Sequence, residues 1–500
     1  MEVLMSHLLK KKLSFIFIIL QFVITLGVIG LVLYVDMLPD KYLLVFVLGV
    51  IFLLLYTFFS QMSKRLYILG RVLSVIFCVV LCIGSAYLWR GYAAISNMSA
   101  VNVKVDEMSA IVLAEDKAQS ISEVLDYKFG ILETIGREYT DSMIQTIEED
   151  NDKKLSIVSY NDIQTLVNAL YSKEVGVIVF NEAFREVITD YFKDFETTTK
   201  VLGNHKVETV IDVEDEEKDE EDTITKPFVL YCSGIDAYGA LAKTSRSDVN
   251  ILAVVNPQTA QILLVNTPRD YFIPLSISNG ARDKLTHAGI YGVDVSIETL
   301  EMLYDIDIDY YARVNFSGLQ DIVDALGGVK VYSDYTFTSD WGPSFKEGYN
   351  NVNGKQALAF CRERHHLEFA GGDRQRGRNH QHMISAILDK ATSPSILKNF
   401  NKLMKSLEGA FETSMKTKKI TKYAKYQLEE MPKWTINSIS VDGTGGREYT
   451  YSLPSRSSYV MYPDDNTVNE ARSAIKKILS GQKFKNKKNK KNNNNNSSSN

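Results

Sequence analysis

Residues 228–270 read FVLYCSGIDAYGALAKTSRSDVNILAVVNPQTAQILLVNTPRD, and this stretch sets the expectation for the fold. It contains three apolar runs, Phe228–Cys232, Val249–Val255 and Ile262–Val265, separated by turn-forming and charged residues. Their short length and their β-branched and aromatic content predict three strands. We therefore expect the core of a sheet in this part of the chain.

Predicted strands and predicted helices alternate from here towards the C-terminus. Further strand-like runs lie at Tyr311–Val314, Ala357–Cys361 and Ile436–Val441. Helical apolar spacing lies between the runs, at Val295–Tyr304, Leu319–Leu326 and Asn379–Lys390. The pattern predicts a mixed α/β sheet with helices on its faces, in a large domain at 225–480. A Lys-, Asn- and Ser-rich tail follows at 481–500, and its composition predicts disorder.

Charged residues stand at the ends of the first three predicted strands. Asp236 follows the first strand, Arg246 and Asp248 precede the second, and Arg269 follows the third. Strand tips are where open α/β sheets bind ligands. A divalent cation on Asp236 and Asp248 would balance the two carboxylates. Phosphate oxygens on Arg246 and Arg269 would balance the two guanidinium groups.

A second group of arginines comes later. The predicted strand Ala357–Cys361 runs into Arg362 and Arg364, which would share one face of that strand. The segment 371–378 then adds Arg376 and two neighbouring arginines before a predicted helix. An arginine cluster alone is usually a solvated or ion-paired surface. Combined with the aspartate pair, it favours a pyrophosphate site, because the guanidinium fork binds phosphate bidentately.

The N-terminal region 1–100 is a predicted membrane unit. Three apolar runs, at about 13–35, 42–59 and 68–88, are long enough to cross a bilayer. Lysines precede the first run, and Lys64 and Arg65 lie between the second and third. The positive-inside rule then places the N-terminus in the cytoplasm and the rest of the chain, after about Arg90, outside. This topology, with a net charge of −5, argues against nucleic-acid binding and ATP-dependent chemistry.

A small region lies between the membrane unit and the large domain. Short apolar runs alternate with helical patterns at Ile121–Tyr127 and Asp162–Leu170, which predicts an α/β accessory domain at 101–210. Asn161 or Asp162 is the expected N-cap of the second helix. The acidic segment 211–224 is expected to be a linker, since it lacks the glycine turn and spaced ligands of a calcium loop.

Several short motifs occur together in one order along the large domain. They are Gly234-Ile-Asp236, Arg246-Ser-Asp248, Thr267-Pro-Arg269-Asp270, His287-Ala, Gly327-Gly-Val329 and Arg362-x-Arg364. Each is weak alone, but the ordered set resembles the LytR-CpsA-Psr family of Gram-positive cell envelopes. The three spans followed by a small extracytoplasmic domain are similar to its streptococcal, capsule-forming members.

The resemblance implies a membrane-anchored phosphotransferase. Such an enzyme moves a polymer, here capsular polysaccharide, from an undecaprenyl-pyrophosphate carrier to peptidoglycan and forms a phosphodiester. It implies Mg²⁺ or Mn²⁺ as cofactor and an apolar pocket for the lipid tail. The implied partners are the polyprenyl-linked polysaccharide, the peptidoglycan acceptor and membrane lipid, with other capsule-assembly membrane proteins as further candidates. The implied location is the cell membrane of a Gram-positive bacterium, with the catalytic domain outside.

The resemblance also assigns roles to individual residues. Asp236 and Asp248 match the metal-binding aspartates. The matching pyrophosphate-binding residues are Arg246, Arg269, Arg362, Arg364 and Arg376, and the implied catalytic group is Asp236, Asp248, Arg246 and Arg269. The family usually has a glutamine four residues after the position of Arg376. Here that position is His380 and Gln381 follows, so either residue could take the role.

Two alternatives keep the same site. With water as acceptor, the same residues would make a pyrophosphatase of lipid-linked precursors. A non-catalytic chain would bind the carrier and regulate capsule production.

The remaining histidines and cysteines favour structural roles. We expect His287 to be structural, and no zinc site at His365 and His366, because Cys or His partners at zinc spacing are missing. Cys232 and Cys361 lie on predicted core strands, where a disulfide is possible but two free thiols are favoured.

Overall fold

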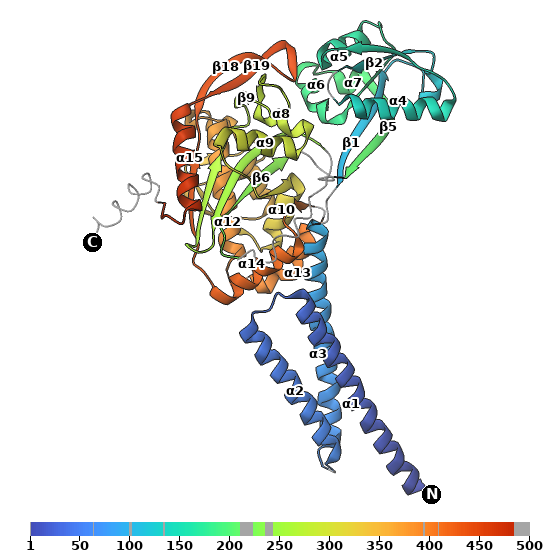
Figure 1. Cartoon of the computed structure of the whole chain (residues 1–500), viewed down its shortest axis with the longest axis vertical. Coiled ribbons are helices and arrows are strands. Elements are labelled where there is room, and N and C mark those ends of the chain that lie inside the picture. The colour runs from blue at the N-terminus through green and yellow to red at the C-terminus, as the bar shows by residue number, and fades with distance from the viewer. Residues whose placement is uncertain are drawn as a thin grey trace, which may run out of the picture. The chain divides into compact units, whose positions relative to one another are not determined.

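The computed structural model describes residues 2–63, 65–99, 103–133, 136–210, 224–235, 244–393, 396–408 and 410–484. These residues fall into two compact units (Figure 1). The first lies within 1–100, 394–408 and 415–433, and the second within 101–393, 409–414 and 434–500. Asp236, most of the predicted linker and most of the predicted tail lie outside the described residues.

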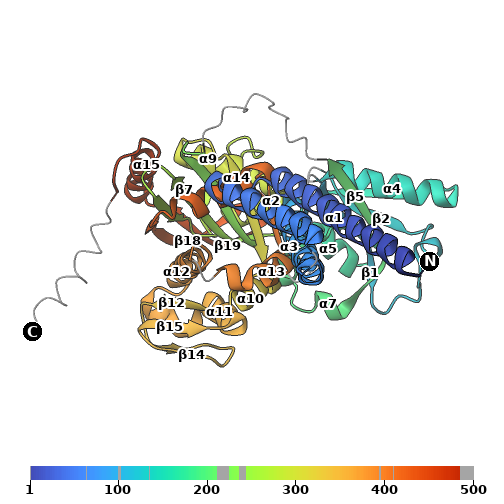
Figure 2. The same ribbon diagram turned by 90° about the horizontal axis from the view of Figure 1, so that it is seen from below.

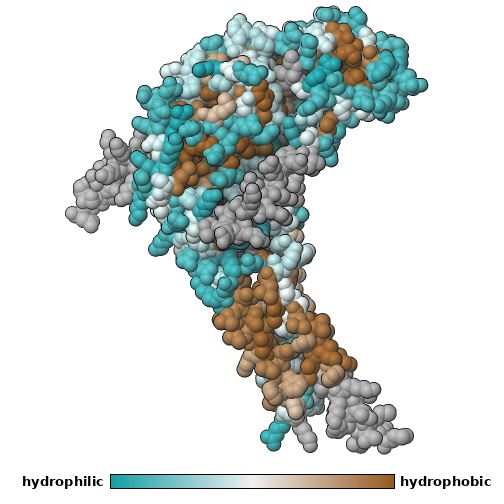
Figure 3. Space-filling model, in the orientation of Figure 1, coloured by the Kyte–Doolittle hydropathy of each residue, from teal (hydrophilic) through white to brown (hydrophobic). Residues whose placement is uncertain are grey.

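The first unit contains three long apolar helices, α1 (Glu2–Val35), α2 (Asp40–Met62) and α3 (Tyr67–Ser99). The segment Phe15–Val35 and the helices α2 and α3 are each long and apolar enough to cross a membrane. Leucine, valine and phenylalanine side chains cover their outer surfaces, as the brown atoms of Figure 3 show. Apolar surface of this extent suits lipid rather than water.

Two helices from much later in the sequence join the same unit, α13 (Ile396–Leu407) and α14 (Thr417–Glu430). Asn97 of α3 donates a 3.1 Å hydrogen bond to Glu408. Lys425 of α14 forms ion pairs of 2.9 Å with Asp36 and 2.8 Å with Asp40, between α1 and the start of α2. The three apolar helices are therefore packed and ion-paired with a part of the chain that the sequence pattern assigned to the large domain.

The second unit contains a five-stranded sheet of order β3-β2-β4-β1-β5. Its strands are β1 (Val103–Leu113), β2 (Lys128–Leu132), β3 (Ser156–Tyr160), β4 (Val177–Asn181) and β5 (Thr199–Val210). Its helices are η1 (Ile121–Glu123), α4 (Arg137–Asn151), α5 (Ile163–Tyr171), η2 (Glu182–Phe184), α6 (Arg185–Tyr191) and α7 (Phe195–Thr198).

The two helices expected in this region have different outcomes. Asp162 caps α5 by accepting 2.9 Å hydrogen bonds from the amides of Gln164 and Thr165, as predicted. The helix expected at Ile121–Tyr127 is wrong, since only the 3₁₀ turn η1 forms there.

A six-stranded sheet forms the other half of this unit, in the order β16-β11-β6-β7-β8-β17. Its strands are β6 (Phe228–Ile235), β7 (Ser247–Asn256), β8 (Gln261–Asn266), β11 (Tyr310–Asn315), β16 (Phe411–Thr413) and β17 (Thr435–Ser440). β6, β7 and β8 are antiparallel neighbours, whereas β11 and β17 pair in parallel with β6 and β8. The mixed sheet is thus confirmed.

Helices cover both faces of this sheet. On one face, Tyr231, Leu252 and Val265 pack in a core with α9 (Val293–Tyr304) and α15 (Asp465–Leu479). On the other face, Ile251 and Leu264 pack against α12 (Asp373–Ala391). Alternate residues of a strand point to opposite faces, which is why consecutive residues of β7 enter different cores.

Smaller elements complete the unit. They are β9 (Phe272–Pro274), β10 (Arg282–Lys284), α8 (Leu285–Tyr291), α10 (Phe316–Ala325), β12 (Val329–Ser333), β13 (Phe337–Thr338), β14 (Ser344–Phe345), β15 (Gly348–Val352), α11 (Gly354–Arg362), η3 (His365–Ala370), β18 (Gly443–Thr450) and β19 (Leu453–Pro463). Figure 2 shows β12, β15 and α11 side by side.

The strand expected at Ala357–Cys361 is wrong, because these residues form α11. A capping box starts the helix: Asn353 accepts a hydrogen bond from the amide of Gln356, whose side chain accepts one from the amide of Asn353. Arg362 and Arg364 consequently do not share the face of a strand. A short apolar run does not distinguish a strand from a buried helix, and the capping residues decide the matter here.

Candidate functional site

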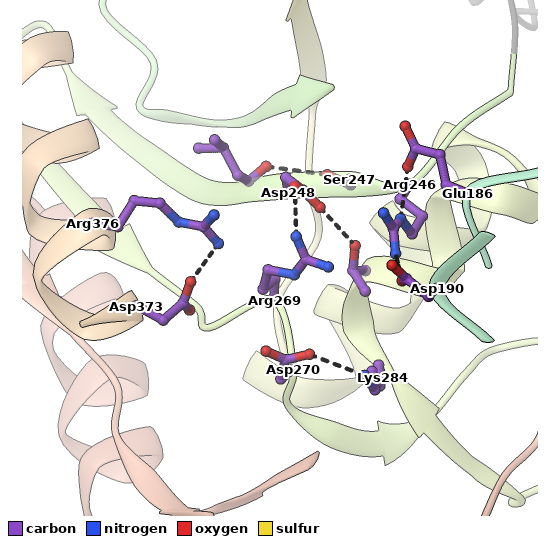
Figure 4. A network of polar contacts seen from close by, with 12 residues as sticks. Glu186, Asp190, Arg246, Ser247, Asp248, Arg269, Asp270, Lys284, Asp373 and Arg376 are labelled. Carbon is purple, nitrogen blue, oxygen red and sulfur yellow. Dashed lines mark hydrogen bonds and ion pairs between the residues drawn. The ribbon is translucent and has the colours of Figure 1, made fainter. Parts of the chain in front are cut away.

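Asp248 and Arg269 meet at one edge of the six-stranded sheet. The start of β7 lies beside the end of β8, and the amide of Thr267 donates to the carbonyl of Asn250 at 2.9 Å. A guanidinium nitrogen of Arg269 lies 2.5 Å from Oδ2 of Asp248 (Figure 4). Thr286 of α8 donates to the other carboxylate oxygen at 3.2 Å. Antiparallel pairing thus places on one edge two residues that are well separated in sequence.

The Asp248 carboxylate is ionised although only 11% of its side chain is exposed. Burial alone would raise the pKa of Asp248, but the guanidinium groups of Arg269, Arg376 and Arg246 hold this pKa below its ordinary value. Arg269 is also largely buried, with 15% of its side chain exposed. The site therefore holds a fixed negative charge among positive charges.

Arg376 comes from the first turns of α12 and is ion-paired with Asp373, three residues earlier (Figure 4). Asp248, Arg269 and Arg376 all line one cleft of about 640 Å³. Tyr332 and Tyr349, from β12 and β15, line it as well. Two arginines that line one cleft can bind an anion such as a phosphate, and the tyrosines can contact an attached group.

Arg246 is directed away from this cleft. Its guanidinium group contacts Glu186 at 2.8 Å and Asp190 at 2.7 Å, both on α6 (Figure 4). The backbone directly before Arg246 packs closely on α8, since a Cβ on Gly289 would lie 2.5 Å from the carbonyl oxygen of Ser245. The backbone of Arg246 therefore lies next to the site, two residues before Asp248. Its side chain is held by two carboxylates of the accessory region.

Arg362 lies at the end of α11, where its guanidinium carbon is 4.5 Å from the ring centroid of Phe316 and 4.6 Å from that of Trp341. Such stacking fixes a guanidinium group while leaving its edge available for hydrogen bonds. Arg364 follows in the next loop and is exposed. Neither arginine lines the cleft of Asp248 and Arg376.

His380 and Gln381 occupy adjacent positions on α12 but have different partners. Nε2 of His380 lies 2.8 Å from the carbonyl oxygen of Cys361. Burial, reinforced by Arg376, lowers the pKa of His380 to about 3. The imidazole is therefore neutral, and its Nε2 carries the proton that it donates to the carbonyl.

Gln381 instead connects two strands. Its amide nitrogen donates to the carbonyls of Leu264 at 3.0 Å and Ile439 at 2.6 Å, on β8 and just before the end of β17. Its carbonyl oxygen accepts from Ser440 at 3.1 Å. Gln381 borders the cleft, but its hydrogen-bonding groups hold the sheet together.

A divalent cation fits the donor chemistry of Asp248, which is an ionised oxygen ligand at the border of the cleft. The other predicted ligand, Asp236, lies outside the described residues. It directly follows Ile235, which pairs with Ser247 next to Asp248. The described part of β6 therefore ends at Ile235, beside the start of β7 that carries Asp248.

Sequence reasoning missed Thr286, Asp373 and the two carboxylates that hold Arg246. Thr286 directly precedes His287, so the motif around that histidine was the available signal. His287 itself is buried and lies 2.7 Å from Asp283, in the structural role expected for it. Cys232 and Cys361 are both free thiols, as favoured from the sequence.

A family model described as the LytR_cpsA_psr family matches residues 187–476. The chain belongs to this family. The match includes every residue of the site described above except Glu186.

Curated relatives are similar over part of this region. The polyisoprenyl-teichoic acid–peptidoglycan teichoic acid transferase TagU of Bacillus licheniformis is 33% identical over 190 residues, which cover 38% of this chain and 60% of that protein. The TagU protein of Bacillus subtilis is 33% identical over 201 residues, or 40% of this chain and 64% of the relative. The chain thus spans less than two thirds of the length of these relatives.

Solved structures are similar over about half of the chain. The crystal structure of B. subtilis TagV is 25% identical, covers 52% of this chain and 99% of that chain, and has a TM-score of 0.43. The structure of B. subtilis TagU is 27% identical, covers 52% and 99%, and has a TM-score of 0.39.

Proposed function

We propose that this chain is a membrane-anchored phosphotransferase that moves capsular polysaccharide from an undecaprenyl-pyrophosphate carrier to peptidoglycan. The observation that carries the proposal is the ionised Asp248, held by Arg269 beside Arg376 in a cleft of the family domain. The names of the curated relatives support a polyisoprenyl-linked donor and a peptidoglycan acceptor. The choice of capsular polysaccharide as the polymer is supported only by the order of three predicted spans, a small domain and a large domain along the chain.

The reaction exchanges one phosphorus–oxygen bond for another. A hydroxyl of the acceptor sugar attacks the phosphorus next to the polysaccharide, and the bond from that phosphorus to the bridging oxygen breaks. Undecaprenyl phosphate leaves with the bonding electron pair, and the hydroxyl proton passes to solvent or to a carboxylate. The pyrophosphate bond is already activated, so the reaction needs no ATP outside the cell.

The residues of the cleft have separable roles in this scheme. Arg269 and Arg376 bind the phosphate oxygens and stabilise the charge of the leaving phosphate. Asp248 orients Arg269 and, with Asp236, would hold Mg²⁺ or Mn²⁺. When bound, that ion supplies further positive charge to the phosphates. Arg362 and Arg364 would bind the pyrophosphate only in a substrate-bound arrangement that brings the end of α11 and the loop after it to the cleft.

The decisive test uses full-length protein in detergent, a lipid-linked oligosaccharide and a soluble peptidoglycan fragment. Release of undecaprenyl phosphate and formation of the glycan–peptidoglycan phosphodiester are measured by mass spectrometry. We expect Asp248→Asn and Arg269→Ala to abolish both products. Asp305→Asn, which removes an exposed carboxylate paired with Lys476, is the matched control and should retain full activity.

Each other outcome decides between the alternatives. Release without transfer, equal with and without acceptor, would indicate a pyrophosphatase. Tight donor binding without release would indicate a non-catalytic binder that regulates capsule production. Full transfer by Asp248→Asn protein would contradict the assignment of the site. The proposed location, with a cytoplasmic N-terminus and an external family domain, is tested by labelling introduced cysteines on intact cells.

A further inference from the structure

A group of side chains with metal-binding chemistry lies on two loops beside Arg362. Asp340 is in the loop between β13 and β14, and Glu363 and His366 follow α11. Nδ1 of His366 lies 3.2 Å from Oδ1 of Asp340 and 3.6 Å from Oε1 of Glu363. One ligand atom from each of the three residues lies within 4.8 Å of the other two.

The two carboxylates are held in place by the surrounding protein. Glu363 has a side chain with 0% exposure, and it accepts hydrogen bonds from the amides of Asp340 at 2.8 Å and His366 at 2.9 Å. Nδ1 of His365 lies 2.8 Å from Oδ2 of Asp340, which is the carboxylate oxygen that does not face His366. An outer hydrogen bond of this kind orients a ligating carboxylate and is common around bound metals.

The spacing suits a small tetrahedral ion. Zinc binds nitrogen and oxygen ligands at about 2.0–2.2 Å, which places neighbouring ligand atoms of a tetrahedron about 3.3–3.6 Å apart. The 3.2 Å and 3.6 Å separations around His366 match this value. An imidazole in the ligand set disfavours Mg²⁺ and Ca²⁺, which take oxygen ligands. Because 54% of the His366 side chain is exposed, an ion can enter from solvent.

We infer that Asp340, Glu363 and His366 form a zinc-binding site, with His365 orienting Asp340 and water completing the coordination. The position gives the ion a structural consequence. Trp341 directly follows Asp340 and stacks on Arg362, which directly precedes Glu363. Zinc would therefore fix the loop that carries Trp341 to the segment that carries Arg362. Any effect on transfer through Arg362 rests on the proposed function, whereas zinc binding does not.

Sequence spacing did not indicate this site. The sequence expectation excluded zinc because His365 and His366 have no cysteine or histidine partners at zinc spacing. The ligands found here are carboxylates instead, and one of them lies in a loop before α11. Folding of α11 brings that loop beside the histidines.

The experiment is a zinc titration of full-length protein in detergent, stripped with EDTA and competed against a chromophoric chelator. We expect one tightly bound equivalent of zinc, unaffected by a hundredfold excess of Mg²⁺. His366→Ala and Asp340→Asn should each weaken zinc binding at least tenfold. His205→Ala, which removes a partly buried histidine bonded to Ser142, should bind zinc as the wild type does.

A second measurement reports the loop without reference to activity. Zinc should change the fluorescence of wild-type protein, and Trp341→Phe should remove that change while leaving the bound equivalent. Absence of a bound equivalent in wild-type protein would overturn the inference. Zinc binding by His366→Ala and Asp340→Asn as tight as that of the wild type would overturn it as well. Protein that transfers glycan but binds no zinc would overturn this inference alone. Protein that binds zinc but transfers nothing would contradict only the proposed function.

Discussion

The neutral imidazole of His380 predicts a specific loss of stability in mild acid. The pKa of His380 is lowered to about 3, mainly by burial, whereas an unfolded histidine titrates at about 6.5. Between these values the unfolded chain binds a proton that the folded chain does not. This contribution to stability is therefore complete above pH ~6.5 and is lost as the pH falls towards ~3.

The size of the effect follows from the same two pKa values. Well inside this window each pH unit costs about 1.4 kcal/mol. Because the unfolded histidine is only half protonated at pH ~6.5, a fall from pH ~6.5 to pH ~4.5 costs about 2.3 kcal/mol. For a domain of this size, the loss lowers the thermal midpoint by about 3–4 °C. His380→Gln removes the titrating group but keeps a donor for the carbonyl of Cys361. Between the two pH values, the thermal midpoint of the variant should therefore fall by that much less than the midpoint of the wild type.

The assay is thermal unfolding of full-length protein in detergent, followed by tryptophan fluorescence at both pH values. Other titrating groups affect wild type and variant equally, so the difference between the two isolates His380. His205→Gln, on β5, leaves His380 in place and should show the wild-type dependence. If the midpoint of His380→Gln falls as steeply as that of the wild type, His380 is not held neutral and the reasoning is refuted.

Three further substitutions test other contacts. Asp248→Asn should lower the thermal midpoint at neutral pH, since breaking a buried ion pair costs about 3–5 kcal/mol. Because the pKa of Asp248 is depressed, this stability is present above pH ~4 and lost below it, so the variant and wild-type midpoints should converge in strong acid. Gly289→Ala should cost about 1–3 kcal/mol, because its Cβ meets the backbone of Ser245, and an unchanged midpoint would contradict the close packing. Lys425→Gln should cost less than about 1 kcal/mol, since its aspartate partners are exposed, and a larger fall in midpoint would show that these ion pairs matter more than their exposure indicates.

Much of the architecture follows from local sequence patterns. Apolar runs with turn residues between them predicted β6, β7 and β8, and three long apolar runs predicted α1, α2 and α3. The meeting of Asp248 and Arg269 also followed, since charged residues at the ends of adjacent strands share an edge of the sheet. Short-range signals were sufficient in these places because each element has a clear apolar period and clear ends.

The rest depends on contacts between distant parts of the chain. Ala357–Cys361 is apolar in either secondary structure, and its identity as a helix is set by Asn353 and by the core that it enters. The side chain of Arg246 is directed by Glu186, which is sixty residues away in sequence. The cluster of Asp340 and His366 exists only after α11 has folded between its two loops. Patterns within a short window contain no information about such pairs.

The membership of α13 and α14 in the first unit has a consequence for biosynthesis. A chain is made from its N-terminus, and about 300 residues separate the end of α3 from the start of α13. At about 5–20 residues per second, this interval lasts roughly 15–60 s. During that time α1–α3 exist without two of their packing partners. Removing the first hundred residues to obtain a secreted fragment would leave the opposite defect, because α13 and α14 would remain without the helices on which they pack.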